Sequence, residues 1–307
     1  MEWGTGPVAL VVITLLCGAV VVGAPRLLRS PVTGVGCSVL LVITVLTRPP
    51  SPGWPADGWV LAMCDVGQGD GLVLNAGPGT GVVVDAGPDP EVMDRCPDRL
   101  GITDVPLVVL THFHADHVDG LPGVLADRRV GEVDVTSMVD PPEGAAAVSR
   151  SLDVSPVVAP YGLTRKVGDV TLQTLWPLPD APTAGIGDGS AANDASVVLL
   201  AQGVRILLTG DIEPPGQLAL RRTLPDLHVD VLKVPHHGSR HRDLDFPVGL
   251  RAGLALVSVG ADNDYGHPDS GPVAALTATG AVVRRTDLDG DLLVLRTDDG
   301  IAVRGRG

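Results

Sequence analysis

The amino-acid sequence predicts an α/β domain that follows two apolar segments long enough to cross a membrane. Three observations lead to this prediction. From residue 58 to the end, short runs of aliphatic and β-branched residues alternate with helix-like stretches. Two uncharged runs, residues 6–25 and 31–47, come before this region. Directly after one strand-like run, residues 112–117 concentrate histidine and aspartate.

The two apolar runs are the basis of a membrane prediction. Each is close in length to the roughly 20 residues that a helix needs to cross the hydrocarbon core. A signal peptide would begin with basic residues, but none occurs before the first run. Arg26 and Arg29 lie between the runs, and positively charged loops stay in the cytoplasm, although Arg48 weakens this bias. We therefore expect two transmembrane helices in the cell membrane, with the following domain on the extracytoplasmic side.

A proline-rich segment separates the apolar runs from the rest of the chain. Residues 49–57 contain four prolines, a composition that disfavours regular structure. We expect residues 1–48 to form the membrane unit, residues 49–57 to form a linker, and residues 58–307 to form one folded domain.

The predicted domain is rich in short strands that glycine-containing turns separate. We expect strands at residues 59–63, 72–75, 82–84, 107–110, 196–201, 205–208, 229–234 and 254–259, with three more between residues 281 and 304. We expect helices at residues 90–100, 121–128 and 212–222. Residues 177–189 form a polar loop rich in glycine and proline, and the stretch before it has no clear periodicity.

The motif H-x-H-x-D-H follows the buried strand expected at residues 107–110. Its histidines and aspartate are ligands that divalent transition metals prefer. His112 and His114 can converge on one ion, and Asp116 and His117 on a second. Two neighbouring ions make a hydrolytic centre, because they polarise the target oxygen and lower the pKa of water. A histidine-rich surface loop is the alternative, which this spacing after a strand disfavours.

The segments around this motif resemble the metallo-β-lactamase fold superfamily, through V-V-V-D-A-G at residues 82–87 and L-L-T-G-D at residues 207–211. Four segments narrow the resemblance to the carboxy-terminal domain of the ComEC/Rec2 competence proteins: residues 64–70, 193–198, 233–239 and 265–268. The resemblance implies a four-layer αββα sandwich over residues 58–307, with two divalent metal ions. It also implies a role in DNA uptake. Full-length members have many more membrane helices, so we expect a separate membrane channel protein as a possible partner.

The resemblance assigns three further positions to the metal centre. Asp211 would bridge both ions, although it could instead cap the helix that follows. His236 and His237 follow a strand, and side chains alternate along a strand, so only one should point inward. We favour His236 as a ligand of the second metal and His237 as a group directed toward substrate. His267 lines the site as a ligand, a proton donor or a phosphate-binding group.

The first metal site departs from the superfamily pattern. Most members use a further histidine between the motif and the bridging aspartate, but none occurs here between His117 and His228. Asn193 and Asp194 stand in the corresponding place. Asp194 would supply an oxygen ligand, with Asn193 beside it, and oxygen donors shift the preference from zinc toward manganese. The choice between zinc and manganese therefore stays open.

Several residues are expected to support the ligands or the substrate. Asp65 and Asp70 flank a glycine-rich turn, and Asp85 ends a strand. Such carboxylates commonly orient ligating imidazoles, and Asp85 is the strongest candidate. Lys233 and Ser239 could contact a phosphate group. A strand-edge lysine is an equal alternative for Lys233.

The net charge argues against a wide surface for DNA. The chain carries −14, and residues 58–307 alone carry −15, because the first 57 residues hold three basic and two acidic side chains. Nucleic-acid binders usually carry a basic footprint. Two bound divalent ions would offset part of this charge and contact phosphate directly.

Two smaller expectations concern side chains outside the motif. Cys64 and Cys96 could form a disulfide outside the cell, but we expect two separately buried thiols. His228 and His241 should be exposed to solvent.

The leading hypothesis is a membrane-anchored two-metal phosphodiesterase, a nuclease that acts on DNA outside the membrane. Asp116 would position the nucleophile, and His237 or His267 would assist the leaving group. One alternative is a hydrolase of another ester, of the phosphorylcholine or lactone type, which the acidic surface favours. Another is a metal-stabilised domain without turnover that docks on a separate channel protein.

Overall fold

The computed structural model of this chain describes residues 30–47, 53–180 and 189–306. The chain divides into two units, with the boundary between Pro52 and Gly53. The first unit contains helix α2 (Pro31–Thr47), which covers the second apolar run. The first run, residues 6–25, lies outside the described residues. No helix in the part of the chain that is described combines the length and apolarity needed to cross a membrane.

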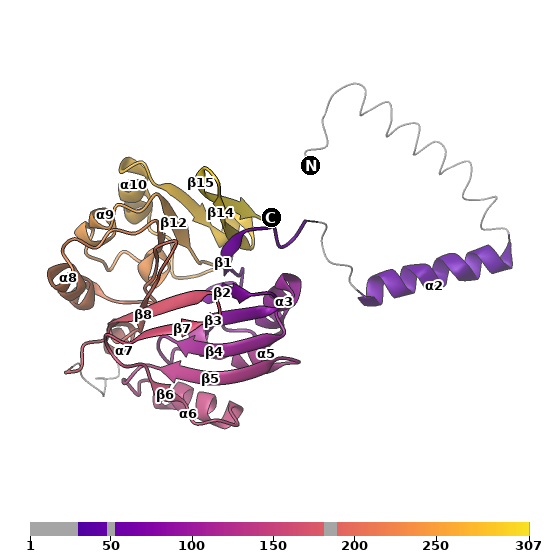
Figure 1. Ribbon diagram of the computed structural model, residues 1–307, viewed down its shortest axis with the longest axis horizontal. Helices are drawn as coiled ribbons and strands as arrows, with labels where there is room; N and C mark the ends of the chain where they lie inside the picture. Colours follow the sequence, from indigo (N-terminus) through magenta and orange to yellow (C-terminus); the bar gives the residue numbers. More distant parts are fainter. Residues whose placement is uncertain (1–29, 48–52, 181–188, 307) are drawn as a thin grey trace, which may run out of the picture. The chain divides into compact units, whose positions relative to one another are not determined.

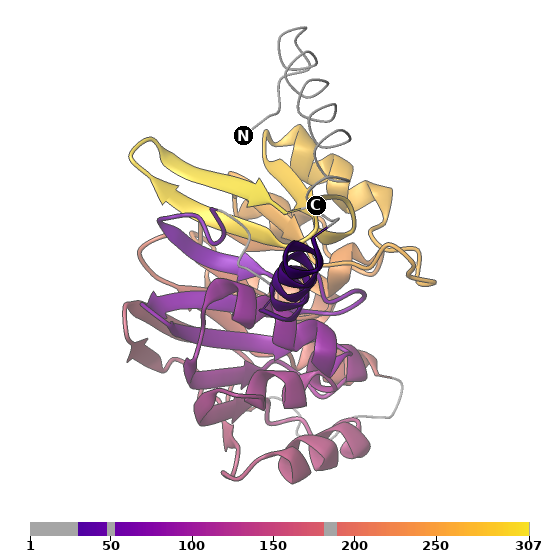
Figure 2. The same cartoon turned by 90° about the vertical axis from the view of Figure 1, so that its right-hand side faces the viewer.

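The second unit consists of two mixed β-sheets packed face to face (Figure 1, Figure 2). Within the described residues, the eight-stranded sheet has the order β15-β14-β1-β2-β3-β4-β5-β6, and the seven-stranded sheet has the order β13-β12-β11-β10-β9-β8-β7. The strands of the first sheet are β1 (Trp59–Met63), β2 (Gly71–Gly77), β3 (Thr80–Ala86), β4 (Asp104–Leu110), β5 (Arg129–Val135), β6 (Val157–Val158), β14 (Leu292–Thr297) and β15 (Gly300–Gly305). Those of the second are β7 (Thr164–Val167), β8 (Val170–Trp176), β9 (Val198–Ala201), β10 (Ile206–Leu208), β11 (Val231–Lys233), β12 (Leu254–Val257) and β13 (Val282–Arg285).

Helices cover the outer face of each sheet. Apolar side chains of α3 (Pro90–Leu100), α4 (Ala115–Val118), α5 (Leu121–Leu125) and α6 (Pro142–Ser151) pack on the eight-stranded sheet. Those of α8 (Pro214–Thr223), α9 (Asp245–Gly249) and α10 (Ser270–Ala278) pack on the seven-stranded sheet. The short helices α7 (Ser190–Asp194), η1 (Pro235–Gly238) and α11 (Thr286–Asp289) lie in connections. The predicted arrangement of two packed sheets with helices outside is therefore confirmed.

The alternation of side chains along the strands explains the layers. Val82 and Val84 of β3 belong to the core between the two sheets, whereas Val83 belongs to the core beneath the helices. In β4, Leu107 faces the core between the two sheets, and Val108 faces the core beneath the helices. A strand whose two faces are both buried reads as an apolar run, which is why these strands are visible in the sequence.

The parallel strands bring the motif segments to one edge. Strands β3 and β4 are parallel, as are β10, β11 and β12, so their carboxyl ends point the same way within each sheet. Asp85 ends β3, and residues 111–117 follow β4. Residues 209–211 follow β10, and residues 235–239 follow β11. Loops at the carboxyl ends of parallel strands are the usual place for a site in α/β proteins.

The middle of the chain contains elements that the sequence did not reveal. The charged sequence R-V-G-E-V-D-V forms β5, of which only the second half is buried. Helix α5 ends at Leu125, three residues before its predicted end. Arg128 lies beyond the helix because its buried guanidinium forms ion pairs with Asp94 and Asp98 of α3.

The two cysteines of the domain form a disulfide, so the prediction of separate thiols is wrong. Cys64 directly follows β1, and Cys96 lies on the buried face of α3. Both side chains enter the same core between the sheet and the helix, which brings two residues separated by 32 positions together. The bond ties α3 to the beginning of the segment that leads to Asp70.

Candidate metal centre

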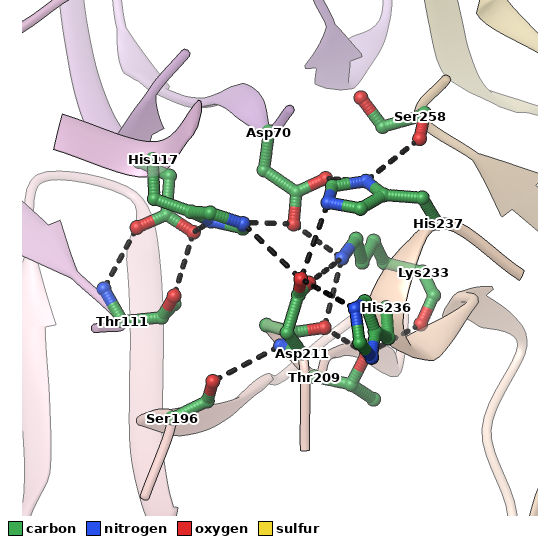
Figure 3. A network of polar contacts seen from close by, with 12 residues as sticks. Asp70, Thr111, His117, Ser196, Thr209, Asp211, Lys233, His236, His237 and Ser258 are labelled. Atoms are coloured by element: carbon green, nitrogen blue, oxygen red, sulfur yellow. Dashed lines mark hydrogen bonds and ion pairs between the residues drawn. The ribbon is translucent and has the colours of Figure 1, made fainter. Parts of the chain in front are cut away.

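Two carboxylates and two imidazoles lie close together at the carboxyl ends of the parallel strands. Asp116, His117, Asp211 and His237 each offer one ligand atom, and these atoms all lie within 4.8 Å of one another. Oδ2 of Asp211 lies 3.3 Å from Nε2 of His117 and 3.2 Å from Nε2 of His237. Oδ2 of Asp116 lies 3.7 Å and 3.4 Å from the same two nitrogens. Figure 3 shows both imidazoles directed toward Asp211. The sequence motif and two distant segments thus converge on one point.

The bonding of the two imidazoles fits a metal ion. Nδ1 of His117 lies 2.9 Å from Asp85, and Nδ1 of His237 lies 2.9 Å from the carbonyl oxygen of Ser258. The Nε2 atoms are buried and have no hydrogen-bond partner among the described residues. Buried polar atoms are normally bonded, so two such nitrogens that face carboxylates fit the coordination of a cation. Two imidazoles and two carboxylates are a suitable donor set for a divalent transition metal.

His112 and His114 form a second pair beside this cluster. Nε2 of His112 lies 3.1 Å from Nδ1 of His114, and the ring of His112 is centred 4.1 Å from that of His117. Nδ1 of His112 lies 3.1 Å from the hydroxyl of Thr111 and 3.3 Å from that of Ser196. These hydroxyl contacts leave Nε2 of His112 directed toward His114, as a metal ligand would be. The pair is the candidate first metal site.

The residues expected to complete this first site lie elsewhere. Oδ1 of Asp194 accepts a hydrogen bond of 2.8 Å from the backbone nitrogen of Gly216 near the start of α8. Nδ2 of Asn193 donates to Oε1 of Glu213 over 3.3 Å. In the described part of the chain, neither side chain contacts His112. The prediction that Asp194 is an oxygen ligand does not match this placement, because its carboxylate already caps the neighbouring helix.

The pair His236 and His237 differs from the expectation for a strand end. Both residues have left-handed backbone conformations, with φ of 50° and 53°, in the short helix η1. This turn directs both side chains toward the site, whereas a strand would have separated them. His237 belongs to the four-residue cluster. Nδ1 of His236 instead lies 3.0 Å from Glu213, and its Nε2 is 3.9 Å from Asp211. The preference for His236 as the ligand is therefore not what the geometry favours.

Asp85 has the contacts of a residue that orients a ligand. Its carboxylate accepts hydrogen bonds from the backbone nitrogen and the hydroxyl of Thr111, at 2.7 and 2.8 Å, besides its contact with His117. Asp65 does not share this role. It is exposed, and its carboxylate accepts a bond of 3.4 Å from the backbone nitrogen of Gly67. The expectation for Asp65 is wrong because the turn after it points its side chain away from the histidines.

Asp70 and Lys233 form a buried ion pair behind the cluster. Both side chains are fully buried. Nζ of Lys233 also donates to the carbonyl oxygen of Gly210 over 2.8 Å and lies 3.4 Å from Oδ1 of Asp211. Lys233 is in β11, which lies between β10 and β12, so it is neither a strand-edge lysine nor a surface contact for phosphate. Both predictions for Lys233 are therefore wrong.

Three further polar residues were singled out in the sequence. The hydroxyl of Ser239 is buried and accepts a hydrogen bond of 3.1 Å from the backbone nitrogen of His241, and its contact with a phosphate group stays a prediction. His228 and His241 are exposed, as expected.

The local charges set the protonation of the ligands. Burial lowers the pKa of His237, but Asp211 and Asp70 outweigh it and raise the pKa to about 10. For Asp116, burial raises the pKa, and the neighbouring histidines lower it by more, so that the carboxylate stays ionised. Burial holds the pKa of His112 well below its usual value. His112 is therefore neutral at pH 7, the form in which an imidazole binds a metal.

His267 lies at the side of the cluster that is nearer to solvent. Its ring is centred 5.5 Å from that of His236 and 6.3 Å from that of His237. Burial and the two neighbouring histidines lower its pKa to about 4, so the imidazole is neutral at pH 7. His267 thus lines the centre without belonging to the four-residue cluster.

Sequence reasoning missed one residue of the site and the main partner of another. Asp70, expected to orient an imidazole, closes the D-V-G-Q-G-D segment and forms an ion pair with Lys233. A lysine inside the apolar run V-D-V-L-K-V could have indicated a buried ion pair. Glu213 holds His236 and is mostly buried. Its position two residues after Asp211 was the available signal.

The fold and the donor set define the class of the protein. The chain belongs to the metallo-beta-lactamase superfamily, which matches residues 64–245. It is a hydrolase of this fold with candidate sites for divalent metal ions. The resemblance seen in the sequence motifs is thereby confirmed.

The narrower resemblance is also confirmed by a relative. Over 198 residues the chain is 29% identical to ComE operon protein 3 of Bacillus subtilis (strain 168), which covers 62% of this chain and 25% of the relative. The chain thus matches only about a quarter of the length of this relative. Among solved structures, YhfI from Bacillus subtilis is 11% identical with a TM-score of 0.47, covering 73% of this chain and 96% of that one. A metallo-beta-lactamase from Hirschia baltica is 16% identical with a TM-score of 0.37, covering 57% and 79%.

Proposed function

We propose that this chain is a two-metal phosphodiesterase that cleaves DNA in a DNA-uptake system. The observation that carries the proposal is the cluster of Asp116, His117, Asp211 and His237, in which the buried Nε2 atoms face carboxylates and have no hydrogen-bond partner among the described residues. The similarity to ComE operon protein 3 supports the substrate class. A separate membrane channel protein is the partner that this role would require.

The residues divide between the two ions by position. His117 and His237 would hold one ion, because Asp85 and the carbonyl of Ser258 fix their rings with Nε2 inward. His112 and His114 would hold the other ion, and Asp211 is the carboxylate that we expect to bridge both. When bound, a pair of divalent ions lowers the pKa of water and neutralises charge on the phosphate oxygens. The zinc or manganese preference stays a prediction.

Asp116 is the carboxylate of the cluster that is accessible to a substrate. Its side chain is 33% exposed, whereas those of His117, Asp211 and His237 are at most 3% exposed. Because Asp116 is ionised, it can accept a hydrogen bond from the attacking water and orient it. His237 is buried and bonded on Nδ1, so it is not placed to assist the leaving group. His267 is neutral at pH 7 and can donate its N–H to a phosphate oxygen without carrying a positive charge.

An activity assay tests the proposed reaction. Purified protein should hydrolyse bis-p-nitrophenyl phosphate and DNA with Mn²⁺ or Zn²⁺. Asp116→Asn should lower the rate by about 100-fold or more, because a positioned proton acceptor contributes that much. His228→Ala is the matched control, since His228 is exposed and outside the centre. Hydrolysis of a lactone or a phosphorylcholine ester in place of both phosphodiesters would overturn the proposal.

The charge of the domain favours a second candidate. Residues 58–307 carry −15, which suits a small ester substrate better than a long polyanion. The same assay separates the two, because a hydrolase of small esters would leave DNA intact. A protein that binds metals and hydrolyses none of these substrates would instead be a docking domain.

The proposal includes anchoring in the cell membrane, with the hydrolase domain on the extracytoplasmic side. Its support is the uncharged helix α2 and the placement of Arg26 and Arg29 before it. A reporter that is active only in the cytoplasm, fused after Gly307, should be silent. A strong signal would overturn this orientation.

A further inference from the structure

An exposed tyrosine lies next to the candidate metal centre. The chain has only two tyrosines among its 3% of aromatic residues. Tyr265 is 74% exposed, so most of its side chain is accessible to solvent. Tyr161, the other tyrosine, is 39% exposed and lies between β6 and β7, away from the centre.

The loop that carries Tyr265 is held by one asparagine. Nδ2 of Asn263 donates to the carbonyl oxygens of Gly260 and His267, over 2.7 and 2.9 Å. Its Oδ1 accepts from the backbone nitrogen of His267 over 3.0 Å. These three bonds close the loop on itself, so the exposed ring stands on a fixed backbone.

Near-parallel rings connect the surface to the centre. The ring of Tyr265 is centred 5.8 Å from that of His267 with an angle of 29° between them. The ring of His267 is in turn centred 6.3 Å from that of His237, at 25°. His267 therefore supports Tyr265 on one side in a stacked arrangement. The high exposure of Tyr265 leaves much of its surface available to a ligand.

We propose that Tyr265 is a stacking platform for an unpaired nucleobase beside the phosphate that the centre binds. The inference rests on the proposed phosphodiesterase function and names its substrate as single-stranded nucleic acid. In a duplex both faces of each base are covered by neighbouring base pairs, whereas an unpaired base can stack on an aromatic side chain.

The charge of the domain limits how a single strand could be held. Proteins that hold single strands usually combine a basic groove with aromatic platforms. Here the domain carries −15, so a basic groove cannot supply most of the affinity. Metal ions at the centre would bind the phosphate, and Tyr265 would bind the nucleobase.

Binding of a labelled oligonucleotide tests the platform independently of turnover. The probe is a short, fluorescein-labelled thymidine oligomer with phosphorothioate linkages, which resist hydrolysis, titrated with full-length protein in Mn²⁺. Tyr265→Ala should raise the dissociation constant by about 5- to 150-fold, which corresponds to the loss of one stacked base. Tyr265→Phe should bind like the parent, because stacking needs no hydroxyl. Tyr161→Ala is the matched control and should also bind like the parent.

Two further probes separate stacking from other effects. An abasic oligomer of the same length should bind weakly to the parent and equally to Tyr265→Ala. A duplex of the same sequence should show no dependence on Tyr265. The platform is overturned if Tyr265→Ala binds the single strand as tightly as the parent, or if the parent does not bind it at all. Binding that depends on Tyr265 without any hydrolysis would instead support the platform and count against the proposed phosphodiesterase activity.

Discussion

The ammonium group of Lys233 lies between two carboxylates, in an ion pair with Asp70 and 3.4 Å from Oδ1 of Asp211. Because Lys233 occupies the side of Oδ1, the other oxygen of Asp211 faces the imidazoles of His117 and His237. Burial lowers the pKa of Lys233, but the two carboxylates outweigh it and raise the pKa above its ordinary value. The lysine is therefore a fixed positive charge that orients the carboxylate expected to bridge the ions (Figure 3).

The buried ion pair should matter for stability. Lys233→Met removes the ion-pair partner of the buried Asp70 and should lower the free energy of unfolding by about 3–5 kcal/mol. The double variant with Asp70→Asn should recover part of this loss, because no charge is left unpaired. Urea unfolding of the metal-free proteins measures both. A Lys233→Met protein as stable as the parent would show that the pair is not needed.

Asp211 should be required for both metal ions. Its Oδ2 lies close to the imidazoles of the four-residue cluster, and its backbone nitrogen donates to Ser196 beside His112. Asp211→Ala should therefore reduce the metal content from two ions per chain to none, as measured by elemental analysis after dialysis. Asp65→Ala is the control and should keep both ions, because Asp65 is exposed and away from the centre. A content of two ions in Asp211→Ala would remove this residue from the centre.

Metal binding should release protons at neutral pH. The pKa of His237 is raised to about 10 in the metal-free fold, so its imidazole is protonated at pH 7. A raised pKa stabilises the metal-free fold below the ordinary value of 6.5, and this contribution is lost as pH rises through about 10. A metal must displace the proton on Nε2, so metal affinity should increase with pH.

Calorimetry measures this release directly. Titration of Mn²⁺ into metal-free protein at pH 7, in two buffers with different ionisation enthalpies, should give heats that differ. A His237→Gln variant should release fewer protons per ion bound. Heats that are independent of the buffer would contradict the protonated state of His237.

The elements with strong local signals could be predicted from the sequence. Helix α3 was placed at its observed bounds, because Asp89 caps its first turn and Gly101, with φ of 71°, ends it. Strands β3 and β4 were visible because both of their faces are apolar. The motif at residues 111–117 could be interpreted because the spacing of its ligands is local.

The parts of the site that depend on tertiary contacts could not be predicted. The orientation of His236 and His237 follows from the left-handed backbone conformation of both residues, which no pattern of side chains in the sequence predicts. Asp194 was assigned to the metal because it stands near the place of the missing histidine. Its carboxylate caps α8 instead, and α8 is distant in sequence. Lys233 was interpreted as a surface residue. Its partner Asp70 lies in the loop between β1 and β2 of the opposite sheet, and the sequence does not show that the two meet.

The disulfide between Cys64 and Cys96 should stabilise the domain and the loop that carries Asp70. The bond closes a loop with a sequence separation of 32 residues. The chain-entropy model gives about 3–4 kcal/mol for a loop of this size. Urea unfolding should therefore show a loss of about this amount when a reductant is present.

Two controls separate this effect from a general effect of the reductant. The double variant Cys64→Ala with Cys96→Ala should be less stable and should not respond to reductant. Cys37→Ala should behave like the parent, because Cys37 is a free cysteine in α2. Since Cys64 begins the segment that ends at Asp70, reduction should also loosen the partner of Lys233 and weaken metal binding. A parent protein whose unfolding is unchanged by reductant would show that the bond contributes nothing to stability.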